Sequence, residues 1–130
     1  MGFVIIFASV ALLVSINAAI VRLFRRRRAG PGWWIGLTVA WAVGAGLGFL
    51  GGFFFEYRPL PEFRVAGAPI PAAFFHREGP PGHEQWVDFI TPAPLLFAGS
   101  NVVILGLLAA CPVGLAFRLG RRGTEGPRAA

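Results

Sequence analysis

The sequence lacks lysine altogether and contains one cysteine, two histidines and six acidic residues among 130. The single cysteine, Cys111, can form no internal disulfide and supplies no metal site by itself. Neither histidine lies in the long apolar stretches, which argues against haem or chlorophyll held by imidazole there; we expect no cofactor. The sequence shows no nucleophile–base pair, phosphate-binding glycine loop or pair of catalytic carboxylates, so we expect no enzymatic activity.

Charged residues are also scarce, at 14%, whereas 55% of the residues are hydrophobic. The charges gather between three apolar runs, as expected when a charge at the bilayer centre costs about 2.5–3.5 kcal/mol. All twelve basic residues are arginine, which together with abundant Ala, Gly and Pro suggests a GC-rich bacterial genome. Membrane flanks account for the net charge of +6, and no nucleic-acid-binding motif accompanies it, so we expect no nucleic-acid partner.

The three apolar runs predict an all-α membrane protein with transmembrane helices at about residues 2–23, 33–55 and 94–117. Each run has the roughly 20 residues that a helix needs to cross the hydrocarbon core. The first run is followed, not preceded, by arginines, which is the reverse of a signal peptide and predicts an uncleaved helix. We expect one domain, residues 1–122, and a flexible cytoplasmic tail, residues 123–130.

The arginines also predict the orientation of the chain. The first connection carries Arg22 and four consecutive arginines without any acid, and the C-terminal end is again rich in arginine, whereas residues 56–92 hold more acids than arginines. By the positive-inside rule, the first connection and the C-terminus are cytoplasmic, and the N-terminus and residues 56–92 are outside. We therefore expect a multi-pass protein of the bacterial inner (plasma) membrane.

The four consecutive arginines are interpreted as a topological anchor. They also suit anionic lipid headgroups, at about 1 kcal/mol per residue near the membrane surface. Membrane lipids are therefore the expected partners of Arg25, Arg26, Arg27 and Arg28.

The outer segment, residues 56–92, contains seven prolines, which exclude a long helix. Residues 63–65 and 85–90 have strand-like composition, and Gly79-Pro80-Pro81-Gly82 is a strong turn signal. We expect an irregular extracytoplasmic loop, with a short hairpin as one element. His76 and His83 are weak candidates for a metal site, because their spacing fits no zinc signature; a loop-centred metal-dependent enzyme is the corresponding alternative.

Small residues recur every four positions along the second predicted helix and produce overlapping G-x-x-x-G units. Such a pattern forms a groove that lets another helix approach closely. The groove packs either the protein's own helices, which we favour, or a partner subunit or second copy. The helix-packing residues are Gly36, Ala40, Gly44, Gly48 and Gly52, with Gly106, Ala110 and Gly114 on the third predicted helix.

Among the polar residues within the predicted spans, Ser9, Asn17, Thr38 and Asn101 are the candidates for interhelical hydrogen bonds. Matching depths predict hydrogen bonds from Asn17 to Thr38 and from Ser9 to Asn101, each worth about 0.6 kcal/mol. The alternative is that these groups line a path for a solute, although the spans contain no buried charge.

The leading functional hypothesis is a structural or accessory subunit that packs against other membrane helices, with a membrane protein or a second copy as partner. The alternative is an oligomeric transporter or channel for small solutes.

Overall fold

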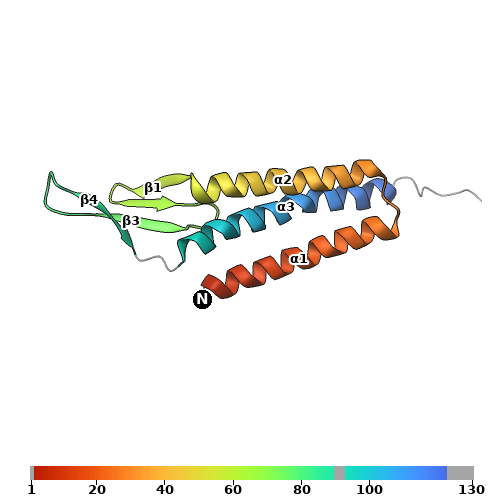
Figure 1. Ribbon diagram of the computed structural model, residues 1–130, viewed down its shortest axis with the longest axis horizontal. Coiled ribbons are helices and arrows are strands. Elements are labelled where there is room, and N and C mark those ends of the chain that lie inside the picture. Colours follow the sequence, from red (N-terminus) through yellow and green to blue (C-terminus); the bar gives the residue numbers. More distant parts are fainter. Residues whose placement is uncertain (1, 90–92, 123–130) are drawn as a thin grey trace, which may run out of the picture. The chain divides into compact units, whose positions relative to one another are not determined.

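The computed structural model describes residues 2–89 and 93–122 and contains three helices and four strands (Figure 1). All three helices are long and apolar enough to cross a membrane. A small antiparallel sheet lies between the second and third helices in the chain. The elements are α1 (Gly2–Arg26), α2 (Pro31–Phe53), β1 (Glu56–Leu60), β2 (Phe63–Ala66), β3 (Ala73–Glu78), β4 (Gln85–Phe89) and α3 (Pro94–Arg122).

The helices differ from the predicted bounds at their ends. α1 continues to Arg26 and α3 to Arg122, because a helix can extend beyond the apolar core and basic residues interact favourably with its C-terminal dipole. α2 begins at Pro31, where the fixed φ of proline suits the first helical position. α2 ends at Phe53, and β1 begins at Glu56. The predicted tail, residues 123–130, lies outside the described residues.

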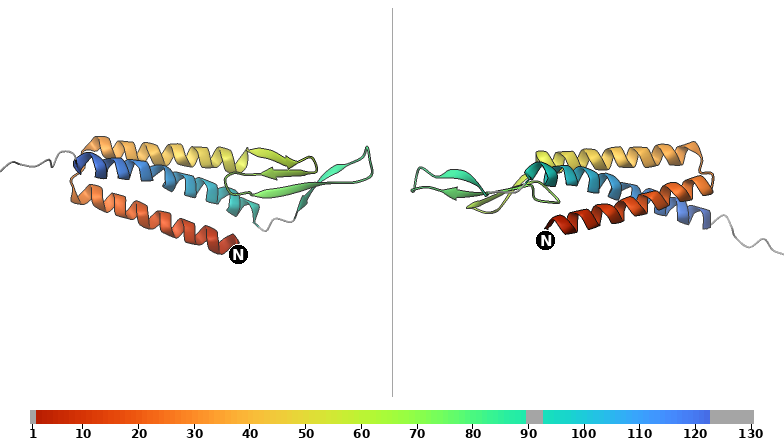
Figure 2. Two further views of the ribbon diagram at one scale, coloured as in Figure 1. Left: turned by 180° about the vertical axis from the view of Figure 1, so that it is seen from behind. Right: turned by 60° about the horizontal axis from the view of Figure 1, so that its bottom comes forward.

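The expectation of an irregular segment between α2 and α3 is wrong for residues 56–89. They form a four-stranded antiparallel sheet in the order β1-β2-β3-β4, seen from two further directions in Figure 2. The expected hairpin is present as β3–β4, and Gly79 and Gly82 in its turn both have positive φ. Residues 90–92 lie outside the described residues, so the end of the second predicted strand at residue 90 is not tested.

Contacts group the chain into two compact units, Met1–Gly44 with Leu105–Ala130, and Ala45–Ile104. In the first unit, α1 and the adjoining parts of α2 and α3 pack around a core of large apolar side chains. Phe24 is fully buried, and its ring centroid lies 5.5 Å from that of Trp34 and 4.5 Å from that of Phe117. These aromatic contacts, each worth about 0.5–1.5 kcal/mol beyond area burial, join the start of α2 to the arginine-bearing ends of α1 and α3.

The second unit holds the sheet together with the end of α2 and the start of α3. Side chains alternate between the two faces of the sheet, as strand geometry requires. Val65, which is 4% exposed, pairs with Phe74 on one face. Arg64 pairs with Phe75 on the other. Pro59, which cannot donate a ladder hydrogen bond, lies in the edge strand β1 where the register shifts.

Candidate functional site

Asn17 joins the three helices of the first unit. Its Nδ2 donates to the carbonyl oxygens of Leu13 (2.9 Å) and Leu107 (3.0 Å), and its Oδ1 accepts a hydrogen bond from Trp41 Nε1 at 2.8 Å. The residue is 5% exposed. Both amide N–H groups are therefore used within the chain, as a buried polar group requires.

The predicted partner of Asn17 is wrong. Thr38 Oγ1 donates to the carbonyl of Trp34 in its own helix, at 3.0 Å. A hydroxyl in a helix commonly bonds to the carbonyl four residues earlier, and this choice leaves it turned away from the neighbouring helix. Trp41 supplies the contact from α2 instead.

Asn101 of α3 is completely buried and holds the connection between β2 and β3. Its Nδ2 donates to the carbonyl of Ile70 and its Oδ1 accepts the Ile70 N–H, both at 2.9 Å. The prediction that Asn101 bonds to Ser9, which is based on their matching depths in the membrane, is therefore wrong, and Ile70 is the partner. A paired donor and acceptor on one amide fixes the backbone of residue 70 in both position and orientation.

A second attachment of the same connection involves α2. Ala68 N–H donates to the carbonyl of Gly51 at 2.9 Å, and a Cβ at Gly51 would lie 2.5 Å from the Ala68 oxygen. Only glycine allows this close approach of loop to helix. The segment between β2 and β3 is therefore hydrogen-bonded to both helices of its unit.

The glycines of α2 separate into two groups. A Cβ at Gly44 would meet the Leu105 oxygen at 2.3 Å, one at Gly48 the Asn101 oxygen at 2.3 Å, and one at Gly52 the Ala98 oxygen at 2.6 Å. Along these three positions the groove holds the protein's own α3. Gly36 has no such neighbour within 4 Å.

The other small residues also differ in their surroundings. Ala110 belongs to the buried core of the first unit, and Gly106 is buried. A Cβ at Gly114 would lie 2.6 Å from the Ile20 side chain, so the absence of a side chain there brings α1 close to α3. Ala40 is half-buried.

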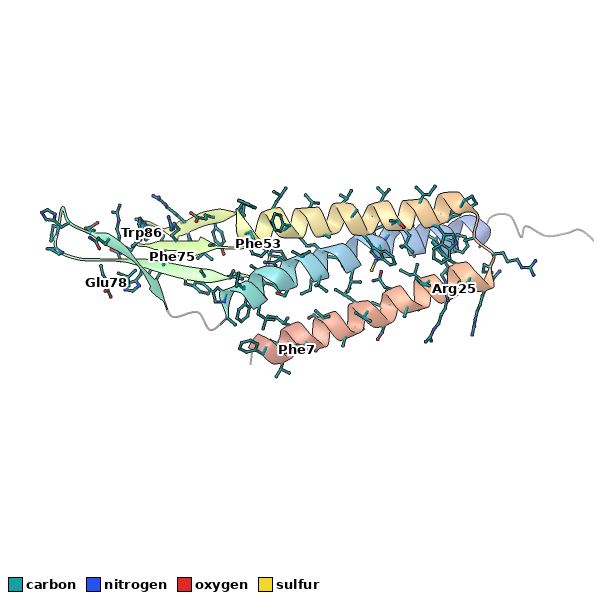
Figure 3. All side chains as sticks on the ribbon, viewed as in Figure 1. Phe7, Arg25, Phe53, Phe75, Glu78 and Trp86 are labelled. Carbon is teal, nitrogen blue, oxygen red and sulfur yellow. The ribbon has the colours of Figure 1, made fainter. Side chains whose placement is uncertain are left out.

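One face of the sheet carries a cluster of cations and aromatic rings that the sequence reasoning missed. The guanidinium carbons of Arg58, Arg64 and Arg77 lie 5.4, 5.5 and 5.4 Å from the centre of the Trp86 ring. Phe75 and Trp86 stand on neighbouring strands (Figure 3). The alternation in β3 and β4 signals which side chains share a face, but the pairing of β2 with β3 joins segments whose register the sequence does not display.

Two acidic residues complete this cluster. Glu56 lies 3.5 Å from Arg64, and Glu84 lies 3.0 Å from Arg77. On this face, ion pairs and cation–π contacts therefore join β1 to β2. They also join β3 to β4 and to the residue that precedes β4. The arrangement stabilises the sheet.

The histidines are not brought together as a metal site. His76 Nε2 lies 2.5 Å from a carboxylate oxygen of Glu78 on the same strand, whereas His83 is in the β3–β4 turn. Within residues 2–89 and 93–122, no group of three or more His, Cys, Asp or Glu side chains is placed to hold a metal ion.

The arginine-rich end of the first unit has no acidic counterpart in the described sequence. Arg25, Arg26 and Arg28 are exposed, as are Arg22 and Arg118. Neither stretch of this unit, as far as residue 122, contains Asp or Glu. The positive charge is therefore available to anions from outside the chain.

Comparison with protein-family models, with curated proteins and with solved structures finds no match to this chain.

Proposed function

We propose that the chain is an integral protein of the bacterial inner membrane that acts as a structural or accessory subunit and presents its sheet to a partner membrane protein. In this proposal the three helices span the bilayer, with the N-terminus and the sheet outside and the arginine-bearing ends in the cytoplasm. The charge pattern of the connections supports this orientation.

Exposed apolar side chains support the membrane assignment. On α2 they recur every three or four residues, and α1 and α3 expose comparable leucine, isoleucine, valine and phenylalanine side chains. A water-soluble monomer rarely exposes an apolar surface this extensive, whereas lipid tails solvate it readily. The α2 positions are Ile35, Val39, Val43, Leu47 and Leu50.

The observation that carries the accessory role is the attachment of the sheet by Asn101. The most deeply buried amide of the helices is used to hold the backbone of Ile70, so the sheet is fixed to helix ends within its unit and not tethered by a loose linker. A fixed surface binds a partner at a smaller entropic cost than a mobile one. This is what a presented recognition surface requires.

The same hydrogen bonds argue against the transport alternative. Asn17 uses both of its N–H donors inside the chain, Thr38 bonds to its own helix and Asn101 bonds to Ile70. A polar lining for a solute would need some of these groups to face a shared lumen. Because these polar side chains are bonded within the chain, a role in packing explains them better than a role in transport.

The proposal is tested by purifying the tagged full chain in mild detergent and analysing it by native mass spectrometry. We expect a membrane protein to co-purify in fixed stoichiometry. The variant Asn101→Leu should lose that partner while remaining in the membrane fraction, because the sheet is released from α3. Ser100→Ala is the matched control, since the Ser100 hydroxyl donates to the Phe97 carbonyl of its own helix. A stable lone monomer would contradict the proposal.

A further inference from the structure

The first unit contains an apolar cleft between α1 and α3, next to the arginine-bearing helix ends. It has a volume of about 280 Å³. Ile16, Ile20 and Leu23 line it from α1, and Cys111 and Leu115 line it from α3. Arg118 is the one charged residue of its lining and stands one helical turn beyond Gly114.

A second hollow adjoins this cleft and is lined by Ala19, Leu23, Arg22 and Arg26 of α1. Ala19 and Leu23 line both, so the two hollows are neighbours along α1. The spacing of 19, 22, 23 and 26 places these residues on one helix face. The two hollows together are therefore lined by apolar side chains and by three arginines, Arg22 and Arg26 from α1 and Arg118 from α3.

We infer that this cleft binds one anionic phospholipid, with an acyl chain between α1 and α3 and its phosphate among Arg22, Arg26 and Arg118. Guanidinium groups bind phosphate oxygens in bidentate geometry, and the described part of this unit offers them no carboxylate. The inference rests on the membrane insertion in the proposed function, which brings these arginines to the headgroup level.

Two other occupants match the cleft less well. A second copy of the chain would bring another set of arginines against the first, and like charges repel at short range. The C-terminal residues 123–130 contain no large apolar side chain that would fill an apolar cleft. A phospholipid supplies both the negative charge and the apolar chain.

Native mass spectrometry of the full chain, titrated with phosphatidylglycerol, tests the site. We compare the double variant Arg22→Gln/Arg118→Gln with Arg25→Gln/Arg28→Gln, which removes the same charge from exposed arginines outside both hollows. Arg22→Gln/Arg118→Gln should raise the Kd of the first bound lipid about 30-fold, because each arginine contributes about fivefold. Arg25→Gln/Arg28→Gln should raise this Kd much less. Equal losses would overturn the site, because they would show that only net charge matters.

The apolar part of the site is tested separately. Ala19→Phe should fill the cleft and weaken phosphatidylglycerol binding without changing charge. Ala18→Phe is the control, because Ala18 is exposed and lines neither hollow. Bound lipid should also slow the reaction of Cys111, the only cysteine, with a maleimide. Unchanged binding in Ala19→Phe would overturn the placement of the acyl chain.

Competition distinguishes the possible sources of the phosphate. Phosphatidylcholine with the same acyl chains and inorganic phosphate should both fail to displace phosphatidylglycerol at equal concentration; displacement by inorganic phosphate would overturn the lipid assignment. A chain that stays soluble without detergent would overturn both proposals. A membrane-bound monomer without a protein partner, but with the expected lipid pattern, would contradict only the accessory role.

Discussion

At the scale of single residues, Asn17 and Asn101 do comparable work with different partners. Asn17 receives a hydrogen bond from a tryptophan of one helix and donates to the carbonyl of another, whereas Asn101 bonds twice to one loop residue. Each side chain provides a hydrogen-bonding partner for polar groups that would otherwise be unsatisfied in an apolar interior. Replacing either asparagine therefore leaves other buried groups without a partner, and the resulting loss of stability can be measured.

Replacing Asn17 by Leu should destabilise the helices by about 1–2 kcal/mol, because Trp41 Nε1 and the Leu107 carbonyl lose a hydrogen-bonding partner. Thr38→Val should cost only a few tenths of a kcal/mol, since its bond stays within one exposed helical turn. Unfolding in mixed micelles, followed by tryptophan fluorescence, measures both. Similar costs for the two variants would contradict the partners described here.

Depth along a helix was not enough to identify these partners. Thr38 lies at a suitable level for Asn17, but depth says nothing about which way a helix face is turned, and Trp41, three residues on, has the reach and the donor. For Asn101 the partner is a loop backbone 31 residues away in the chain. A comparison restricted to polar side chains in the spans does not consider backbone groups of the connecting segment.

At the scale of elements, the glycines of α2 have separate roles. Gly48 places the helix backbone against Asn101 and Val102 of α3, whereas Gly36 has open space beside it. The four-residue period predicts one continuous groove but does not show how much of it a neighbour fills. Close packing of this kind is what holds apolar helices together when lipid tails are as apolar as the side chains.

Gly48→Ala should therefore destabilise the protein by about 1–3 kcal/mol, because its new Cβ would lie 2.3 Å from a backbone oxygen and the helices must separate. Gly36→Ala is the matched control, and it should be neutral or stabilise by up to about 1 kcal/mol through helix propensity. Thermal unfolding in detergent compares them. A Gly36→Ala variant as damaged as Gly48→Ala would show that the groove acts along its whole length.

The sheet depends on Trp86, which lies beside three guanidinium groups. Trp86→Ala should leave three neighbouring arginines without the ring that attracts them. The loss of three contacts, each worth about 0.5–1 kcal/mol, should lower the stability of the sheet by about 1–3 kcal/mol. Trp86→Phe should restore part of the loss. Hydrogen exchange of the β2–β4 amides measures the change, and Val87→Ala on the opposite face is the control. Equal protection in Trp86→Ala and wild type would contradict the role of this cluster.

The helices and the β3–β4 hairpin could be predicted from local signals, whereas the complete sheet could not. Apolar length identifies the helices, and the turn signal from Gly79 to Gly82 before the strand-like residues 85–90 indicates the hairpin, although the composition of β3 does not predict a strand. β1 contains Pro59, which weighs against a strand, and it is accommodated only because β1 is an edge with a register shift. Pairing across the six-residue connection from β2 to β3 is a tertiary contact without a local signal.

At the scale of the whole molecule, the proposed orientation is tested by cysteine labelling. In a Cys111→Ser background, Pro81→Cys in the β3–β4 turn should react with a membrane-impermeant maleimide in cells whose outer membrane has been permeabilised. Gly30→Cys, between α1 and α2, should react only after the inner membrane is also opened. The physical reason is that arginines beside α1 resist translocation across the bilayer. The opposite labelling pattern would contradict the proposed topology.

Both bonds made by Asn101 end on main-chain atoms of Ile70 and not on its side chain. Every amino acid except proline offers the same N–H and C=O, so evolutionary drift at position 70 leaves the attachment intact. Aspartate at position 101 would instead set an acceptor against a carbonyl oxygen. Asn101 is thus constrained, whereas the residue type at position 70 can change without loss of either hydrogen bond.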